Sequence, residues 1–226
     1  MTKRLQRVAR WATLIILSGG PAFADSALYE TGPGQDSSFV RFLNATDGDI
    51  VVVAAKGGYR LPLGAAAEAR VSKFHPAIAG NELRAIIEVR SRMLPIEVVA
   101  KPGEYVTVAV VPVGKDGFRI HLLRETPSDY NASRASISLA NADPECADAA
   151  LSGSAANVAI FQGVKPFAIQ RRLVNPVNVT AQVSCGGIAI AQALEFGQLQ
   201  PGERYSAFVI PGARRRAAFV VRDSAL

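Results

Sequence analysis

The stretch Val99–Pro112, VAKPGEYVTVAVVP, is the strongest indication of the fold, because a related stretch returns as Leu199–Pro211, LQPGERYSAFVIP. Each copy contains a Pro-Gly pair suited to positions i+1 and i+2 of a type II turn, where proline presets φ and glycine accepts a positive φ. Each pair is followed by the most apolar run of its region, rich in the β-branched and aromatic residues that favour strands. We expect a central β-strand after each turn.

A second pair of markers has nearly the same spacing. An Asn-Ala pair at Asn44 follows the strand-like run Phe39–Leu43, and another at Asn141 follows Ser136–Ala140. The Asn-Ala pairs lie 97 residues apart, and the Pro-Gly-Glu triplets lie 99 residues apart. Two independent markers at one spacing favour tandem copies of one fold. The alternative is chance recurrence, since Pro-Gly is a common turn dipeptide.

The remaining sequence has the same character. Short apolar and β-branched runs lie between clusters of Gly, Pro, Asn and Asp, which is the signature of strands. We expect further strands at Ile50–Ala55, Leu83–Arg90, Ile96–Ala100 and Phe118–Leu123. Convincing amphipathic helices are absent, and we interpret the Ala-rich stretch Gly64–Ala69 as a loop.

These patterns predict an all-β protein of two tandem antiparallel β-sandwich domains, produced by an internal duplication. The segment Glu125–Asp129 has the composition of a linker. We therefore expect an N-terminal β-sandwich at residues 25–127 and a C-terminal β-sandwich at residues 128–226.

The first 24 residues have the architecture of a cleaved secretory signal. A basic segment precedes the apolar run Trp11–Leu17, which is shorter than the roughly 20 residues that span a bilayer. Small residues, Ala22 and Ala24, stand at the −3 and −1 positions. We expect cleavage after Ala24 and a periplasmic mature protein. The segment holds four of the basic residues behind the formal charge of +6, so a mature charge of about +2 argues against nucleic acid as a partner.

Two cysteines, Cys146 and Cys185, remain in the mature chain. In an oxidising compartment such a pair usually forms a disulfide. A metal site is the alternative, but two thiols with no nearby histidine make a poor ligand set.

The sequence offers no constellation for catalysis. It has two histidines, His75 and His121, and no Gly-x-Ser-x-Gly elbow, His-Glu-x-x-His pair or phosphate-binding loop. We interpret Asp47 with Asp49 as a solvated hairpin tip rather than a weak calcium site. We expect Asp143 and Glu145 to cap a turn beside Cys146. We expect no catalytic residue, cofactor or metal, and an enzyme built on either histidine is the least favoured class.

Two basic clusters are candidates for binding. Arg171 and Arg172 precede the strand-like run Leu173–Val183, and Arg214, Arg215 and Arg216 occupy what we interpret as the last hairpin turn. Charges at such positions often protect exposed strand edges. The functional alternative is contact with an anionic polymer or with an acidic surface of a partner.

Several short motifs resemble the alginate biosynthesis accessory proteins of the AlgF family. They are Ala27-Leu28-Tyr29 near the mature N-terminus, then Ser37–Arg41 with Asn44, Phe74-His75-Pro76 with Gly80, Asn157–Phe161, and Val174–Val179. Together they cover most of the mature chain in order.

The resemblance implies a non-catalytic periplasmic adaptor for O-acetylation of an alginate-like exopolysaccharide. The expected partners are a membrane-bound acyl transferase and periplasmic acetyltransferases of the SGNH hydrolase-like class, with an anionic polysaccharide as a further candidate. Ala27, Leu28, Tyr29 and the arginine clusters are candidate contacts. The alternative is a carbohydrate-binding β-sandwich for an anionic polysaccharide, although the single tryptophan lies in the signal segment and leaves few aromatic platforms for sugars.

Overall fold

The computed structural model describes residues 37–128, 131–154, 158–212 and 215–224, all of which belong to one compact unit, Pro33–Leu226. These residues form β-strands and one 3-10 turn, η1 (Ala67–Ala69), with no α-helix among them. The all-β prediction is therefore confirmed, and η1 lies within the stretch expected to be a loop. Among the described residues, no helix has the length and apolar character needed to cross a membrane.

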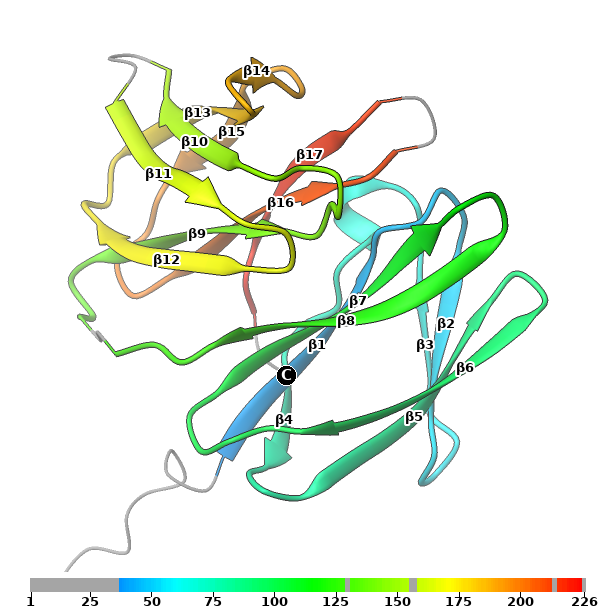
Figure 1. Cartoon of the computed structure of the whole chain (residues 1–226). Helices are drawn as coiled ribbons and strands as arrows, with labels where there is room; N and C mark the ends of the chain where they lie inside the picture. Colours follow the sequence, from blue (N-terminus) through cyan, green and yellow to red (C-terminus); the bar gives the residue numbers. More distant parts are fainter. Residues whose placement is uncertain (1–36, 129–130, 155–157, 213–214, 225–226) are drawn as a thin grey trace, which may run out of the picture. The chain divides into compact units, whose positions relative to one another are not determined.

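The first sandwich comprises the strands β1–β8 (Figure 1). Its strands are β1 (Ser37–Asn44), β2 (Ile50–Ala54), β3 (Arg60–Leu63), β4 (His75–Ile78), β5 (Glu82–Val89), β6 (Arg92–Val99), β7 (Tyr105–Val113) and β8 (Gly117–Glu125). They form two sheets, which we call inner sheet 1, in the order β4-β1-β7-β8, and outer sheet 1, in the order β3-β2-β5-β6.

The second sandwich comprises the strands β9–β17. Its strands are β9 (Ala135–Asn141), β10 (Ala149–Gly153), β11 (Val158–Val164), β12 (Ile169–Val174), β13 (Asn178–Cys185), β14 (Ile188–Ala189), β15 (Leu194–Gln198), β16 (Arg204–Ile210) and β17 (Ala217–Arg222). Inner sheet 2 has the order β12-β9-β16-β17, and outer sheet 2 has the order β11-β10-β13-β14, with β15 also paired to β13.

The two sandwiches have the same topology. In each, the first strand pairs with the fourth and with the penultimate strand, and the second strand pairs with the third and fifth. The predicted boundary at residues 127 and 128 lies in the connection between β8 and β9. Two sandwiches with one strand order are what an internal duplication produces.

Two pairings differ from the antiparallel prediction. β1 pairs with β7, and β9 pairs with β16, in parallel register. Short turns between neighbouring strands produce antiparallel pairing, which is the arrangement that the sequence predicts. These two pairs join strands far apart in sequence, and a long crossover permits parallel pairing. The prediction of one continuous strand-like run over Leu173–Val183 is also wrong. The structure divides this stretch between β12 and β13 at Asn175-Pro176.

The two turns that begin the apolar strands are as predicted. Gly103 and Gly202 have φ values of 71° and 77°, as the third position of a type II turn requires. They lead into β7 and β16, which lie inside their sheets. Both strands are buried on both faces, which explains their nearly continuous apolar sequences.

Alternate side chains of these strands enter different cores. Val106, Val108 and Val110 of β7 lie in the core of the first sandwich. Ala109 and Val111 lie instead in a third core that also contains residues of inner sheet 2. The two inner sheets therefore pack against each other, and the two sandwiches share a buried interface.

The two Asn-Ala markers have a common structural reason. Asn44 ends β1 and is fully buried, and its Nδ2 donates to the carbonyl oxygens of Gly48 at 2.8 Å and Gly64 at 2.9 Å. Asn141 ends β9 in the same way, and its Nδ2 donates to the carbonyl oxygens of Cys146 at 2.7 Å and Val164 at 2.9 Å. Each asparagine fixes the connection that leaves the inner sheet for the outer sheet.

We expect Asn44→Ala to lower the free energy of unfolding by about 2 kcal/mol, because it leaves buried carbonyl groups without donors. Asn141→Ala should have a similar effect, since it occupies the same place in the second sandwich. Urea unfolding measures both changes. Asn81→Ala, at an exposed turn, is the matched control and should leave stability nearly unchanged. Equal effects of all three substitutions would contradict the assigned role.

The predicted disulfide is confirmed. Cys146 and Cys185 are bonded, with their Cα atoms 5.7 Å apart. Cys146 lies in the connection after β9, and Cys185 ends β13. A disulfide of this kind is consistent with a protein that folds outside the reducing cytosol.

Candidate functional site

One end of the interface between the inner sheets is apolar and the other end is polar. The apolar end is formed by Leu43, Val111, Phe208, Ile210 and Phe219, with smaller neighbours. At the polar end, the same sheet faces present the buried side chains of Arg41, Thr107, Ser138 and Ser206. Burial of such groups is costly unless each finds a hydrogen-bond partner.

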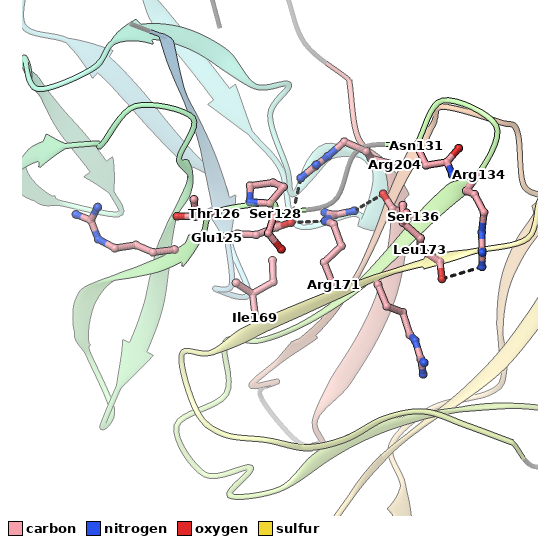
Figure 2. A pocket seen from close by; sticks show the side chains of 13 residues that line it. Glu125, Thr126, Ser128, Asn131, Arg134, Ser136, Ile169, Arg171, Leu173 and Arg204 are labelled. Atoms are coloured by element: carbon pink, nitrogen blue, oxygen red, sulfur yellow. Dashed lines mark hydrogen bonds and ion pairs between the residues drawn. The ribbon is translucent and has the colours of Figure 1, made fainter. Parts of the chain in front are cut away.

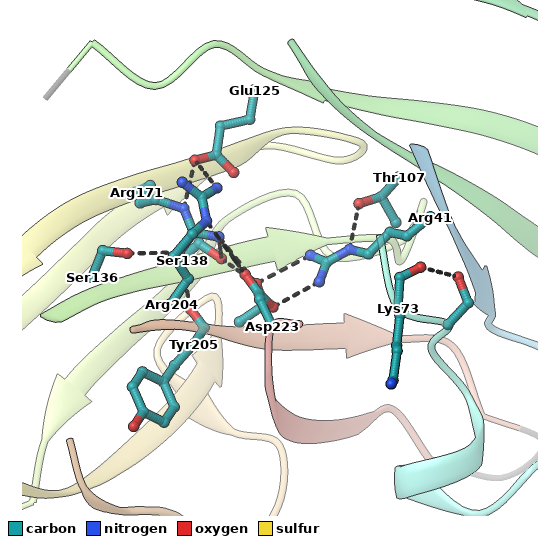
Figure 3. A network of polar contacts seen from close by, with 12 residues as sticks. Arg41, Lys73, Thr107, Glu125, Ser136, Ser138, Arg171, Arg204, Tyr205 and Asp223 are labelled. Carbon is teal, nitrogen blue, oxygen red and sulfur yellow. Dashed lines mark hydrogen bonds and ion pairs between the residues drawn. The ribbon is translucent and has the colours of Figure 1, made fainter. Parts of the chain in front are cut away.

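Asp223, directly after β17, is the counter-ion of Arg41 (Figure 3). Arg41 Nη1 donates to Asp223 Oδ1 at 2.7 Å, and the two side chains are only 1% and 2% exposed. Arg41 also donates from Nε to Thr107 Oγ1 at 2.9 Å and from Nη2 to Ser206 Oγ at 3.1 Å. Ser206 in turn donates to Asp223 Oδ2 at 2.9 Å.

Aromatic rings complete the surroundings of Arg41. Its guanidinium carbon lies 4.3 Å from the ring centroid of Phe74 and 5.0 Å from that of Phe208. Phe74 belongs to the first sandwich and Phe208 to the second. Contacts of this kind favour a cation over the face of each ring, so Arg41 binds both sandwiches.

Arg171 of β12 joins the same network. It donates from Nη2 to Asp223 Oδ2 at 2.9 Å and from Nε to Glu125 Oε1, and its side chain is 9% exposed. Its Nη1 also donates to Ser136 Oγ at 3.1 Å. Arg204 of β16 contacts the same carboxylate oxygen of Glu125, with Nη2 3.2 Å from Oε1. Five charged side chains from both sandwiches therefore form one cluster, which we call the interface network: Arg41, Glu125, Arg171, Arg204 and Asp223.

The duplication explains where the two acids lie. In the first sandwich Val106 pairs with Arg124, and in the second Tyr205 pairs with Arg222. Glu125 and Asp223 are the next residues, so they occupy equivalent positions. Glu125 binds two arginines of the second sandwich, Arg171 and Arg204, and Asp223 binds Arg41 of the first sandwich as well as Arg171 of its own. The network therefore connects the two copies in both directions.

Electrostatics keep Asp223 ionised. Burial by itself raises the pKa of this carboxyl group, but the charges of Arg41 and Arg171 and the hydrogen bonds of Arg41 and Ser206 outweigh burial. The pKa of Asp223 therefore lies below its ordinary value. Burial lowers the pKa of Arg41, and Asp223 opposes that shift.

The network opens at its edge into a pocket (Figure 2). This cavity has a volume of about 680 Å³, within the range of small-molecule sites. Its walls come from the end of β8, the connection after it, and the strands β9, β12 and β16. We call it the arginine pocket after five of its lining residues: Arg124, Arg134, Arg171, Arg172 and Arg204.

A second hollow, of about 510 Å³, lies at the other end of the interface, and its charges are mixed. Its lining includes Arg90 and Asp47, which form an ion pair at 3.0 Å. Arg70 there donates to the carbonyl oxygens of Asn44 and Thr46. Of these two hollows, only the arginine pocket has more positively than negatively charged residues among those described in its lining.

The predicted arginines lie in different settings. Arg171 and Arg172 are within β12 rather than before a strand, and both line the arginine pocket. Arg215 is exposed between β16 and β17, and Arg216 pairs with Asp143 at 2.6 Å. Arg214 and the segment Ala27-Leu28-Tyr29 lie outside the described residues, as does the expected signal segment. The arginines of the two clusters are thus not brought together.

The candidate acids and histidines have local roles. Asp143 Oδ1 accepts a hydrogen bond from the backbone N–H of Glu145 at 2.8 Å, as expected of a residue that caps a turn. His121 stacks on Phe167 with ring centroids 3.5 Å apart, and His75 begins the edge strand β4. Burial lowers the pKa of both histidines, and Arg119 adds to the shift of His121. Within the described ranges, no three His, Cys, Asp or Glu side chains form a metal-binding group.

Sequence reasoning missed most of the interface network. Arg41 carried a signal, because it is a charged residue within the apolar run Phe39–Leu43. Glu125 is the last residue of β8 and Asp223 directly follows β17, and an acid at the end of a strand is unremarkable. Arg204 could not be identified from the sequence, because an isolated arginine in a β-protein is usually a surface residue.

Comparisons with known proteins leave the family open. No family model matches the chain, and no curated protein matches it. Among solved structures, the chain is similar to a "putative cell adhesion protein" of Bacteroides uniformis ATCC 8492, at 9% identity and a TM-score of 0.25. That match covers 84% of this chain and 100% of the other. At this level of similarity, no property of that protein is transferred to this chain.

Proposed function

We propose that this protein is a non-catalytic adaptor in the O-acetylation of an exopolysaccharide, and that it holds a periplasmic acetyltransferase of the SGNH hydrolase-like class near the polymer. The observation that carries the adaptor role is an apolar surface on the outer face of outer sheet 1. The polysaccharide setting comes from the sequence resemblance to the AlgF family.

The apolar surface lies on neighbouring strands. Val53 of β2 pairs with Ile86 of β5, which pairs with Pro95 of β6, so the three side chains form a row across the sheet. Val51 and Met93 belong to the next row, on either side of Glu88. Ile86 is 39% exposed and Met93 is 70% exposed. We call these five apolar residues the outer patch.

Charged side chains border the outer patch, apart from Glu88, which lies between Val51 and Met93, and they pair with one another. Arg60 pairs with Glu88, and Arg84 pairs with Glu82 at 2.6 Å. An apolar centre with a polar rim is the usual anatomy of a protein–protein interface. The rim charges are already neutralised, so a partner can cover them without leaving a buried charge unpaired.

The second sandwich provides an internal comparison. Ser152 of β10 pairs with Gln182 of β13. This pair occupies the position that Val53 of β2 and Ile86 of β5 occupy in the first sandwich. The adjacent inward residues, Leu151 and Val183, are buried like their counterparts in the first sandwich. The two copies have therefore kept the same core pattern, and only the first has an apolar outer face at these positions. This difference supports a binding role for the outer patch.

The test is binding of the mature protein to a periplasmic acetyltransferase of the SGNH hydrolase-like class from the same organism. The double substitution Val53→Ser with Ile86→Gln gives the first sandwich the residues of the second. We expect at least a tenfold weaker affinity, because central apolar residues of an interface commonly contribute more than about 1 kcal/mol each. Isothermal titration calorimetry or biolayer interferometry measures the change.

Ser152→Ala with Ser184→Ala is the matched control on outer sheet 2 and should bind as the unchanged protein does. An unaltered affinity of the Val53→Ser, Ile86→Gln protein would move the contact away from the outer patch. Absence of any binding by the unchanged protein would overturn the proposed function.

A further inference from the structure

We propose that the open edge of β8 is a docking site, at which an extended segment of the partner acetyltransferase adds to inner sheet 1 as a further β-strand. The identity of the partner rests on the proposed function. The place and the mode of binding rest on the structure of the edge itself.

β8 is the last strand of inner sheet 1 (Figure 1). It is nine residues long and pairs with β7 from end to end without a shift of register. β12 contacts β8 across the interface, but among the described residues no backbone hydrogen bond joins β8 to any strand except β7. The backbone groups of an antiparallel strand point alternately towards its partner and away from it. About every second residue of β8 therefore presents an open N–H and C=O.

The other edge strands are blocked or shorter. Proteins protect exposed edges with prolines, bulges, covering side chains and short strands. Prolines stand within β3, β4 and β6, at Pro62, Pro76 and Pro95. β11 pairs irregularly with β10, and an arginine side chain caps a carbonyl group of β12. β8 is the longest edge strand among the described residues and has neither a proline nor a bulge, as expected of an edge that accepts a strand.

The β8 edge is continuous with the outer patch. Arg124 of β8 donates from Nη1 to the carbonyl oxygen of Val99, at the end of β6, at 3.2 Å. At the other end of both strands, Arg90 lies 3.7 Å from Asp116. β6 and β8 therefore lie on the same side of the first sandwich, and Met93 of β6 belongs to the outer patch. One partner can cover the outer patch and reach round β6 to the β8 edge.

A small hollow beside the first half of β8 indicates which side chains the added segment carries. Its volume is about 260 Å³, below the range of small-molecule sites, so it suits a single side chain. The hollow has an apolar lining from Pro112, Val113, Pro144 and Phe167. We expect an apolar side chain of the partner to occupy it.

Arg119 of β8 also lines this hollow, and its side chain is exposed. Among the described residues, no carboxylate pairs with Arg119. The acid in the same lining, Glu145, lies 3.8 Å from Arg216 instead. Specificity in strand addition comes from the side chains that flank the paired backbone. We therefore expect an acidic residue of the added segment opposite Arg119.

Residue-resolved hydrogen exchange by NMR tests the edge directly, with the mature protein alone and in complex with the SGNH hydrolase-like acetyltransferase. In the free protein, alternate amides of β8 should exchange slowly because they are bonded to β7. In the complex, the intervening amides should slow at least tenfold, because they gain carbonyl acceptors from the added strand. Docking on a sheet face alone produces no such alternation. β17, an edge strand of inner sheet 2, is the internal control and should be unchanged.

The expected acid is tested with Arg119→Glu, which should weaken the affinity at least tenfold because like charges then face each other. Arg222→Glu, at an exposed arginine of the edge strand β17, is the matched control and should bind as the unchanged protein does. Circular dichroism checks that both variants fold. Equal weakening by the two variants would overturn the assigned role of Arg119.

The outcomes separate this inference from the proposed function. If the acetyltransferase binds, and Val53→Ser with Ile86→Gln weakens its binding, but exchange in β8 does not change, then the β8 edge is refuted and the proposed function stands. If the unchanged protein does not bind the acetyltransferase at all, both are overturned.

Discussion

Replacing Asp223 with asparagine is expected to lower the free energy of unfolding by about 3–5 kcal/mol, the cost of leaving a buried charge without its partner. Asparagine has nearly the shape of aspartate, so packing is preserved and the negative charge is lost. Arg41 then stays buried with Thr107 and Ser206 as neutral partners only. Arg171 keeps Glu125 and loses its second acid. Denaturant unfolding followed by circular dichroism measures the change.

The matched control is Glu203→Gln, which breaks the exposed ion pair between Glu203 and Arg222 at 2.7 Å. Exposed pairs contribute little to stability, so the control should unfold nearly as the unchanged protein does. If Asp223→Asn and Glu203→Gln had equally small effects, the interface network would not stabilise the fold.

Acid provides an independent readout of the same group. Because the pKa of Asp223 is lower in the folded protein than in the unfolded chain, its ionisation stabilises the fold above the unfolded value of about 3.9. That contribution is lost as the pH falls through the lower folded value. The difference in stability between the unchanged protein and Asp223→Asn should therefore be full at neutral pH and should narrow below about pH 4. A difference that stays constant down to pH 2 would contradict the assigned charge.

The network also shows which parts of the fold could be predicted from the sequence. The strands and turns follow local rules, so the Pro-Gly turns, the central strands β7 and β16 and the duplication were all visible. The continuous apolar run of β7 indicated burial on both faces. It could not identify what covers the second face, because that partner is a sheet from the other copy.

The polar end of the interface depends on contacts between distant residues. Arg41 and Asp223 are 182 positions apart in the chain. A charged residue within an apolar strand indicates that a partner exists, but sequence pattern alone does not choose it among the acids of the chain. Arg171 was predicted as a contact for a partner or polymer, which stays a prediction, and its side chain binds Glu125 and Asp223. Arg172, its neighbour on the opposite face of β12, keeps open donors.

Removal of the disulfide should cost the second sandwich about 3–4 kcal/mol of stability in the chain-entropy model, for a bond that joins residues 39 apart in sequence. Cys146→Ala with Cys185→Ala is the suitable variant, because alanine leaves no polar group in the buried site of Cys146. The first sandwich fixes the corresponding connection differently, with the exposed ion pair between Asp47 and Arg90. Reduction should therefore act on the second sandwich first.

Hydrogen exchange separates the two sandwiches. In the cysteine-free protein, amides of β10 and β13 should lose protection, and those of β2 and β5 should keep it, because only the second sandwich has lost a covalent crosslink. A reducing agent should reproduce this pattern in the unchanged protein and should have no effect on the cysteine-free one, which controls for the reagent. Equal loss of protection in both sandwiches would mean that the shared interface makes them unfold as one unit, and that the disulfide stabilises the whole pair.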